Sequence, residues 1–236
     1  MQVKPDDPPD GEGDGGDGED SALPEEGGDG GASQDGAAGG ASEPIAEAMG
    51  DAPDDWAFDE VMKCGELGYI YGDLLGGYQN NISRIDFCEV LFNVLKDRDA
   101  ALVIKHLGKE SPFTDADVEF ATALNSLGII MGVGEGLFNP DGDITRQEAA
   151  VMLRRAAVAF GADEGGEAAE FSDKDTADDW ALEGIDYVVE MEIMRGVGGG
   201  LFDPLGNYTR QQAYLTMVRL ANVVPDANFQ EDLIGA

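Results

Sequence analysis

The feature that most constrains the fold is an internal repeat, because one short motif occurs three times at nearly constant spacing. Each copy is a hydroxyl residue followed by arginine, at Ser83-Arg84, Thr145-Arg146 and Thr209-Arg210. The successive arginines are 62 and 64 residues apart, and a shared glycine precedes each pair, at Gly72, Gly132 and Gly196. Repetition at a fixed period indicates similar modules, each of which buries its apolar face against its neighbours.

The residues around each motif predict a helix, a glycine turn, a short loop and a second helix. In the third copy, Asp178 and Asp179 suit the positive N-terminal end of a helix. Apolar residues on the expected helix face follow: Trp180, Ile185, Val188, Val189 and Ile193. The glycine-rich run 196–200 ends this helix, because glycine adopts the left-handed conformation of a helix stop. We therefore expect an all-α fold of three helix-loop-helix repeats.

Acidic residues and glycine concentrate before the first repeat. Residues 1–55 contain 17 Asp and Glu against one Lys, with few large apolar side chains. Such a segment buries too little apolar surface to offset its chain entropy, so we predict a disordered, acidic Gly/Asp-rich linker over 1–53. The rest of the chain divides into a divergent repeat 1 at 54–108, repeat 2 at 109–168 and repeat 3 with a C-terminal tail at 169–236.

Helix capping explains the hydroxyl residue of each motif. Thr145 and Glu148 have the spacing of a capping box, in which each side chain binds the backbone amide of the other residue. Ser83 and Thr209 are the equivalent caps in the other two repeats. Capping does not explain the arginine, since a cation is mildly unfavourable in the first turn of a helix.

Two roles for the arginines remain open. A guanidinium beside a helix N-terminus suits a carboxylate or phosphate, which predicts ligand contact by Arg84, Arg146 and Arg210. Alternatively, the arginines form structural ion pairs with acidic residues of the neighbouring repeat, such as Asp178 and Asp179. The two roles are compatible.

The pattern F-x-D, W-A, G, F-x-P and T-R resembles the S-layer homology domain. Repeat 3 carries it at Phe171, Asp173, Trp180, Ala181, Gly196, Phe202, Pro204, Thr209 and Arg210. Repeat 2 carries Phe113, Asp115, Gly132, Phe138, Pro140, Thr145, Arg146 and Glu148. Repeat 1 is weaker, and keeps Trp56, Ala57, Gly72, Ser83 and Arg84.

The resemblance implies a pseudo-threefold spindle in which one helix of each repeat lines a central bundle. It also implies that grooves between repeats bind secondary cell-wall polysaccharide, often carrying anionic pyruvate ketals. The ligand-binding residues would then be Arg84, Arg146 and Arg210, with Trp56 and Trp180 as groove walls. We expect a non-catalytic, monomeric anchor at the cell wall, outside the cell, fused to a cargo domain or acting alone.

Departures from the family pattern indicate that the grooves are not equivalent. Repeat 2 has Ala116 at the register of the tryptophan, and repeat 1 lacks F-x-P and has a shorter loop before Arg84. We therefore expect at least one degenerate groove, with that of repeat 1 the weakest candidate. Core packing is an alternative role for the tryptophans.

Charge and motif content argue against several other classes. A net charge of −35 disfavours nucleic acid and anionic membranes as partners. No apolar run is long enough to span a bilayer, and the N-terminus shows no signal peptide. With one histidine and no nucleotide or hydrolase motif, the sequence predicts no enzyme and no cofactor.

Two structural alternatives stay open. Residues 137–148 partly match a calcium-binding loop, but Leu137 occupies the first ligand position and cannot bind the metal. A lattice-forming module is the other alternative. Cys64 and Cys88 are predicted to be buried thiols, or else a disulfide between paired helices.

Overall fold

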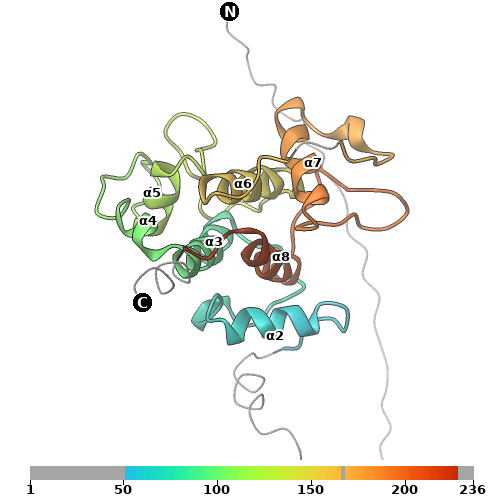
Figure 1. Cartoon of the computed structure of the whole chain (residues 1–236), viewed down its shortest axis with the longest axis horizontal. Coiled ribbons are helices and arrows are strands. Elements are labelled where there is room, and N and C mark those ends of the chain that lie inside the picture. Colours follow the sequence, from blue (N-terminus) through green and yellow to red (C-terminus); the bar gives the residue numbers. More distant parts are fainter. Residues whose placement is uncertain (1–50, 166–167, 228–236) are drawn as a thin grey trace, which may run out of the picture. The chain divides into compact units, whose positions relative to one another are not determined.

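The computed structural model describes residues 51–165 and 168–227 (Figure 1). Within these ranges the α-helices are α2 (Phe58–Glu66), α3 (Arg84–Arg98), α4 (Ala100–Ile104), α5 (Glu119–Ser126), α6 (Arg146–Ala159), α7 (Leu182–Glu190) and α8 (Arg210–Val223). Three short 3-10 helices join them, η1 (Gly72–Leu74), η2 (Lys174–Thr176) and η3 (Asp179–Ala181). The described residues form isolated β-bridges but no strand, so the predicted all-α class is confirmed. The predicted disordered linker lies outside the described residues, apart from 51–53.

The two longer helices of each repeat pack on helices of other repeats. The first helix of repeat 2, α5, packs on α3 of repeat 1, and α7 of repeat 3 packs on α6 of repeat 2. The first helix of repeat 1, α2, packs on α8 of repeat 3, so the order of pairing closes on itself. In Figure 1, α3, α6 and α8 accordingly lie between the outer helices α2, α5 and α7. Each second helix is therefore covered by a helix from the next repeat in this order.

Loops of one repeat also bind the start of the second helix of another. The backbone N–H of Arg84 donates to Gly142 O at 2.8 Å, and that of Arg146 donates to Gly206 O at 3.0 Å. Repeat 1 completes the series, because Arg210 N donates to Asn80 O at 2.9 Å. The first amides of a helix have no partner within the helix. Here the carbonyl groups of a neighbouring loop bind them, which locks the repeats together.

A single hydrophobic core draws on all three repeats. Its largest fully buried side chains include aromatic residues from helices and loops of all three repeats: Tyr69, Tyr78, Tyr187, Tyr208, Tyr214, Phe87, Phe138 and Phe202. Cys64 and Cys88 lie in this core as free thiols, and burial raises the pKa of Cys88 to about 12. Cys64 and Cys88 are thus buried thiols and do not form a disulfide with each other.

The two tryptophans lie outside the core. Trp56 is 57% exposed and Trp180 is 55% exposed, although Trp180 was predicted on the apolar face of a helix. Trp180 belongs to η3, and α7 begins after it at Leu182, so the side chain is not on the buried face of that helix. The tertiary structure thus presents two large aromatic rings to solvent.

Candidate functional site: two matched pockets

Two pockets in the described part of the chain are built from equivalent positions of different repeats. The Trp56 pocket, of about 390 Å³, is lined by Trp56, Arg146, Met194, Arg195, Gly196, Val197, Tyr208, Gln212, Leu215, Thr216 and Arg219. The Trp180 pocket, of about 360 Å³, is lined by Arg84, Met131, Gly132, Val133, Glu148, Val151, Met152, Arg155 and Trp180. Each takes its motif arginine from one repeat, its glycine loop and helix from a second, and its tryptophan from the third.

A buried glutamine on α6 positions Trp180. The Nε2 group of Gln147 donates to Asp178 Oδ2 at 2.8 Å, and its Oε1 accepts from the Asp178 backbone N–H at 3.0 Å. Gln147 is 4% exposed, so these bonds form in a largely dry environment. They hold the segment that carries Trp180 two residues further on.

The same arrangement positions Trp56. Gln211 on α8 donates to Asp54 Oδ2 at 2.8 Å and accepts from the Asp54 N–H at 2.9 Å. The indole Nε1 of Trp56 also donates to Asp54 Oδ2, at 3.1 Å. These hydrogen bonds, above all that from Gln211, lower the pKa of Asp54. Both glutamines directly follow the motif arginine, a regularity that could have predicted their equivalence.

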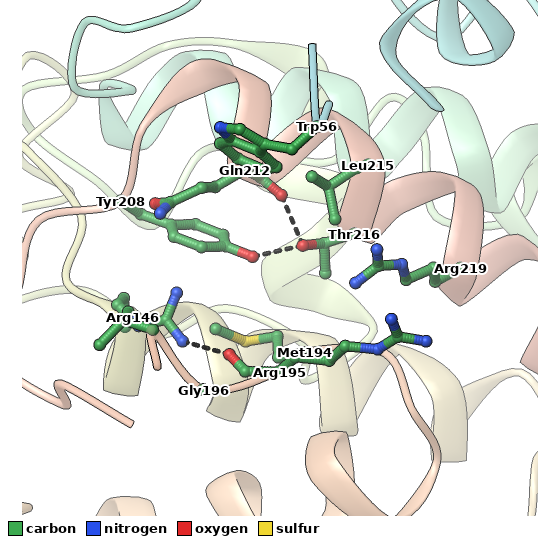
Figure 2. A pocket seen from close by; sticks show the side chains of 11 residues that line it. Trp56, Arg146, Met194, Arg195, Gly196, Tyr208, Gln212, Leu215, Thr216 and Arg219 are labelled. Atoms are coloured by element: carbon green, nitrogen blue, oxygen red, sulfur yellow. Dashed lines mark hydrogen bonds between the residues drawn. The ribbon is translucent and has the colours of Figure 1, made fainter. Parts of the chain in front are cut away.

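Arg146 is the most deeply buried of the three motif arginines. It is 3% exposed, and its Nε and Nη2 groups donate to the carbonyls of Phe202 and Arg195, each at 2.7 Å. Its guanidinium also lies over the rings of Phe202 and Tyr208, at 4.7 and 5.5 Å from their centroids. Burial lowers its pKa, but an arginine stays protonated in proteins. Figure 2 shows Arg146, Tyr208, Arg219 and Trp56 around one opening.

Arg84 makes the equivalent contacts in the Trp180 pocket. Its Nη2 group donates to Met131 O at 2.7 Å, and its Nη1 group contacts Glu148 Oε1 at 3.3 Å. Its Nε atom is buried and lacks a hydrogen-bond partner among the described residues. The pocket therefore contains an arginine whose donors are not all satisfied.

Arg210 lines neither of the two pockets. It donates to Asp73 O and, at 2.9 Å, to Tyr214 Oη, and its Nη1 group lies 3.6 Å from Asp86 Oδ2. The position equivalent to the tryptophans near this arginine is Ala116, which is 8% exposed. The three arginines are thus structurally alike, but two of them meet a tryptophan and the third does not.

The capping hydroxyls occupy the helix ends as their spacing predicts. Thr145 accepts from Glu148 N, and Glu148 Oε2 accepts from Thr145 N at 2.9 Å, while Thr209 and Gln212 form the same reciprocal pair. Ser83 accepts from Asp86 N at 3.2 Å. Since neighbouring loops bind the first amides, these amides are not available to an anion, in contrast to the sequence-based expectation. Any anion binding would therefore depend on side chains.

Three arginines of these pockets were not identified from the sequence: Arg155, Arg195 and Arg219. Arg155 and Arg219 each lie nine residues after a motif arginine, Arg146 and Arg210 respectively, whereas the equivalent residue of repeat 1 is Asn93. Arg155 on α6 therefore lines the Trp180 pocket, and Arg219 on α8 lines the Trp56 pocket. A search for cations at a constant offset from the motif would have found both.

The described residues contain no group of three or more His, Cys, Asp and Glu side chains arranged to hold a metal ion. Within the same residues, every helix is too short or too polar to cross a bilayer.

Comparison with known proteins identifies a domain family. The S-layer homology domain profile matches residues 112–150 and 170–213, which include the starts of α6 and α8. The chain is 26% identical over 174 residues to an amylopullulanase of Thermoanaerobacterium thermosulfurigenes, covering 71% of the chain and 9% of that protein. It is 26% identical over 187 residues to an S-layer protein of Bacillus thuringiensis subsp. finitimus, covering 74% of the chain and 22% of that protein.

A middle cell wall protein of Brevibacillus brevis is 31% identical over 119 residues, which are 49% of this chain and 11% of that protein. The matches thus span less than a quarter of each of these three relatives. The two matched segments contain the arginines at which α6 and α8 begin, so the family match agrees with the repeat seen in the structure. Residues 112–150 and 170–213 of this chain belong to the S-layer homology domain family.

Proposed function

We propose that this chain anchors a protein non-covalently to a bacterial cell wall by binding anionic secondary cell-wall polysaccharide in the Trp56 and Trp180 pockets. One observation carries the proposal: each pocket joins an exposed tryptophan to at least two arginines, although the chain has a net charge of −35. The names of the relatives, an S-layer protein and a middle cell wall protein, support a wall location.

The tryptophans supply the apolar part of such a site. An indole ring offers a large, rigid face against which the C–H face of a sugar ring packs, while its edge stays hydrated. The hydrogen bonds of Asp54 and Asp178 fix the segments that carry these rings, so little conformational entropy is lost on binding. Val133 and Val197, each about half exposed, extend the apolar wall of the two pockets.

The arginines supply the anion-binding part. A guanidinium has five N–H donors, and the hydrogen bonds of Arg146 to carbonyls of the described residues involve only Nε and Nη2. A pyruvyl carboxylate matches the remaining donors in charge and geometry. Because an acidic chain repels an anionic polymer at long range, binding requires such local positive charge.

The structure supports two such sites and not three. The region around Arg210 has Ala116 in place of a tryptophan and Asn93 in place of a second arginine, and Asp86 contacts the guanidinium. We therefore propose two binding pockets per chain, in a non-catalytic, monomeric module outside the cell. The cargo that it holds would be a further part of the protein or a partner.

Sedimentation with purified wall sacculi tests the proposal. Trp56→Ala combined with Trp180→Ala should abolish retention, and extraction of the polymer from the sacculi should do the same to the unmodified protein. Leu205→Ala is the matched control, since Leu205 is 57% exposed and lines neither pocket. Unchanged retention of the double variant, or retention by polymer-free sacculi, would exclude these pockets as the wall-binding site.

A further inference from the structure

We infer that Arg155 sets the charge requirement of the Trp180 pocket, where it binds the carboxylate of an anionic wall sugar, and that the Trp56 pocket lacks such a requirement because Glu60 neutralises its equivalent, Arg219. The inference rests on the proposed function and divides its two pockets into a charge-selective and a charge-tolerant one.

The first observation is that Arg155 is unpaired. It lines the Trp180 pocket from α6, yet it has no hydrogen-bond acceptor or carboxylate partner among the described residues. Its neighbour Arg154 points elsewhere, since it binds Glu183 and lies over the ring of Tyr187. Burial and then repulsion by Arg154 lower the pKa of Arg155. A half-buried cation without a counter-charge is unfavourable, and an incoming carboxylate would relieve that cost.

The second observation is the opposite state of Arg219. This residue occupies the equivalent position on α8, but its Nε and Nη2 groups donate to Glu60 Oε1 of α2 at 3.1 and 2.8 Å. Glu60 lies on the first helix of repeat 1, which packs on α8. The two hydrogen bonds pair the guanidinium with a carboxylate of the protein, so a ligand carboxylate would have to compete with Glu60 for it.

The Trp56 pocket also contains Arg195, at the position of Met131 in the Trp180 pocket, but this exposed arginine pairs with Glu192 at 3.5 Å. The apolar walls of the two pockets differ as well. The Trp180 pocket has Val151 and Met152 where the Trp56 pocket has Leu215 and Thr216, so its wall beside the free cation is apolar. An ion pair between Arg155 and a ligand would be less screened there than at an open surface. Glu148 also lines this pocket, and its contact with Arg84 at 3.3 Å leaves Arg155 as the cation of this pocket that has no partner in the described part of the chain.

Single-pocket proteins separate the two sites. Trp56→Ala leaves the Trp180 pocket, and Trp180→Ala leaves the Trp56 pocket. Calorimetric titration of each would use pyruvylated wall polysaccharide and the same polysaccharide after removal of its pyruvate. In the Trp56→Ala protein, Arg155→Gln should weaken binding of the pyruvylated polymer about 10- to 100-fold, and Arg155→Lys by less. Arg154→Gln, the charge-matched control, should change it less than about twofold.

The Trp56 pocket should respond in the opposite way. In the Trp180→Ala protein, Arg219→Gln should weaken binding less than about threefold, and Glu60→Gln should strengthen binding of the pyruvylated polymer by freeing Arg219. Removal of pyruvate should affect the Trp180 pocket more than the Trp56 pocket. Thermal melting of every variant checks that the fold is intact.

The outcomes distinguish this inference from the proposed function. If both single-pocket proteins bind the polymer but Arg155→Gln and Arg154→Gln behave alike, the role of Arg155 is overturned while the pockets stand. An equal response of the two pockets to pyruvate removal would overturn it in the same way. If neither single-pocket protein nor the unmodified protein binds the polymer, the proposed function itself is wrong.

Discussion

Gln147 and Asp178 hold each other through two reciprocal hydrogen bonds of 2.8 and 3.0 Å, although they belong to different repeats. This pair connects the α6 helix, which forms the wall of the Trp180 pocket, to the segment that carries the tryptophan. The exposed ring is therefore held by a buried polar contact and not by apolar packing. Several consequences of such contacts can be measured.

Loss of the Gln147 amide should release Trp180. In a Trp56→Phe background, where Trp180 is the sole tryptophan, Gln147→Leu should shift the fluorescence emission maximum and raise the mobility of the indole. Because the Asp178 carboxylate and N–H lose their partners, we expect a destabilisation of about 1–3 kcal/mol by urea unfolding. The matched control is Gln211→Leu, which acts on the Trp56 segment. Equal emission changes in the two variants would contradict a local role for Gln147.

Arg146→Ala should destabilise the fold as well as weaken binding. The substitution removes the partners of two carbonyl groups and leaves a gap beside the Phe202 and Tyr208 rings. We expect a loss of about 2–4 kcal/mol in the free energy of unfolding. Arg146→Lys should recover only part of the lost stability, because an ammonium cannot donate to both carbonyls in the geometry of the guanidinium. A loss below about 0.5 kcal/mol would show that these contacts are not structural.

Substitution of the shared glycines Gly72, Gly132 and Gly196 should destabilise the fold for two different reasons, a steric clash or an unfavourable backbone conformation. A Cβ at Gly132 or Gly196 would lie 2.4 or 2.5 Å from the carbonyl oxygen of Leu137 or Leu201, so alanine must displace the loop. At Gly72 the space is open and only the positive φ of 56° opposes a side chain. Thermal unfolding should therefore rank Gly132→Ala and Gly196→Ala below Gly72→Ala, which costs about 1–2 kcal/mol. Tolerance of Asn at position 72, but not at 132 or 196, would support this distinction.

Acid should weaken the loop that Asp115 organises. Its carboxylate accepts from the backbone N–H of Phe138 at 2.7 Å and of Asn139 at 2.8 Å, and these bonds lower its pKa below the ordinary 3.8. A lowered folded-state pKa means that the stabilisation is complete above the unfolded-state value and disappears as pH falls through the folded-state value. Melting temperature should thus drop more steeply below about pH 4 in the unmodified protein than in Asp115→Asn. Parallel curves would refute the assignment.

Sequence alone predicted the helical class, the three motif arginines and the helix caps. These features are local. A capping box such as that of Thr145 and Glu148 lies within one helical turn, so the sequence spacing of the two residues determines their geometry. The pairing of exposed tryptophans with motif arginines in shared pockets also agrees with the site residues that the family resemblance implied, although whether they bind a ligand stays a prediction.

Other features depend on contacts between distant repeats. The sequence placed Trp180 on an apolar helix face, but η3 and the Gln147 contact turn it to solvent. It likewise offered the helix amides as an anion site, which loops from another repeat occupy. Neither the Gln147 contact nor the loop contacts of the helix amides can be predicted from residue spacing within one repeat, because both join different repeats.

What the sequence determined is the repeating unit: its period, its hydroxyl caps and the positions of its cations. What only the tertiary structure decided is which residues of different repeats meet. Arg155 and Arg219 are equivalent in sequence. Arg155 has no partner within residues 51–165 and 168–227, whereas Arg219 binds Glu60, which lies 159 residues away from it. The physical reason is that ion pairing and burial depend on neighbours in space, and the cyclic pairing of helices gives each pocket a different set of neighbours.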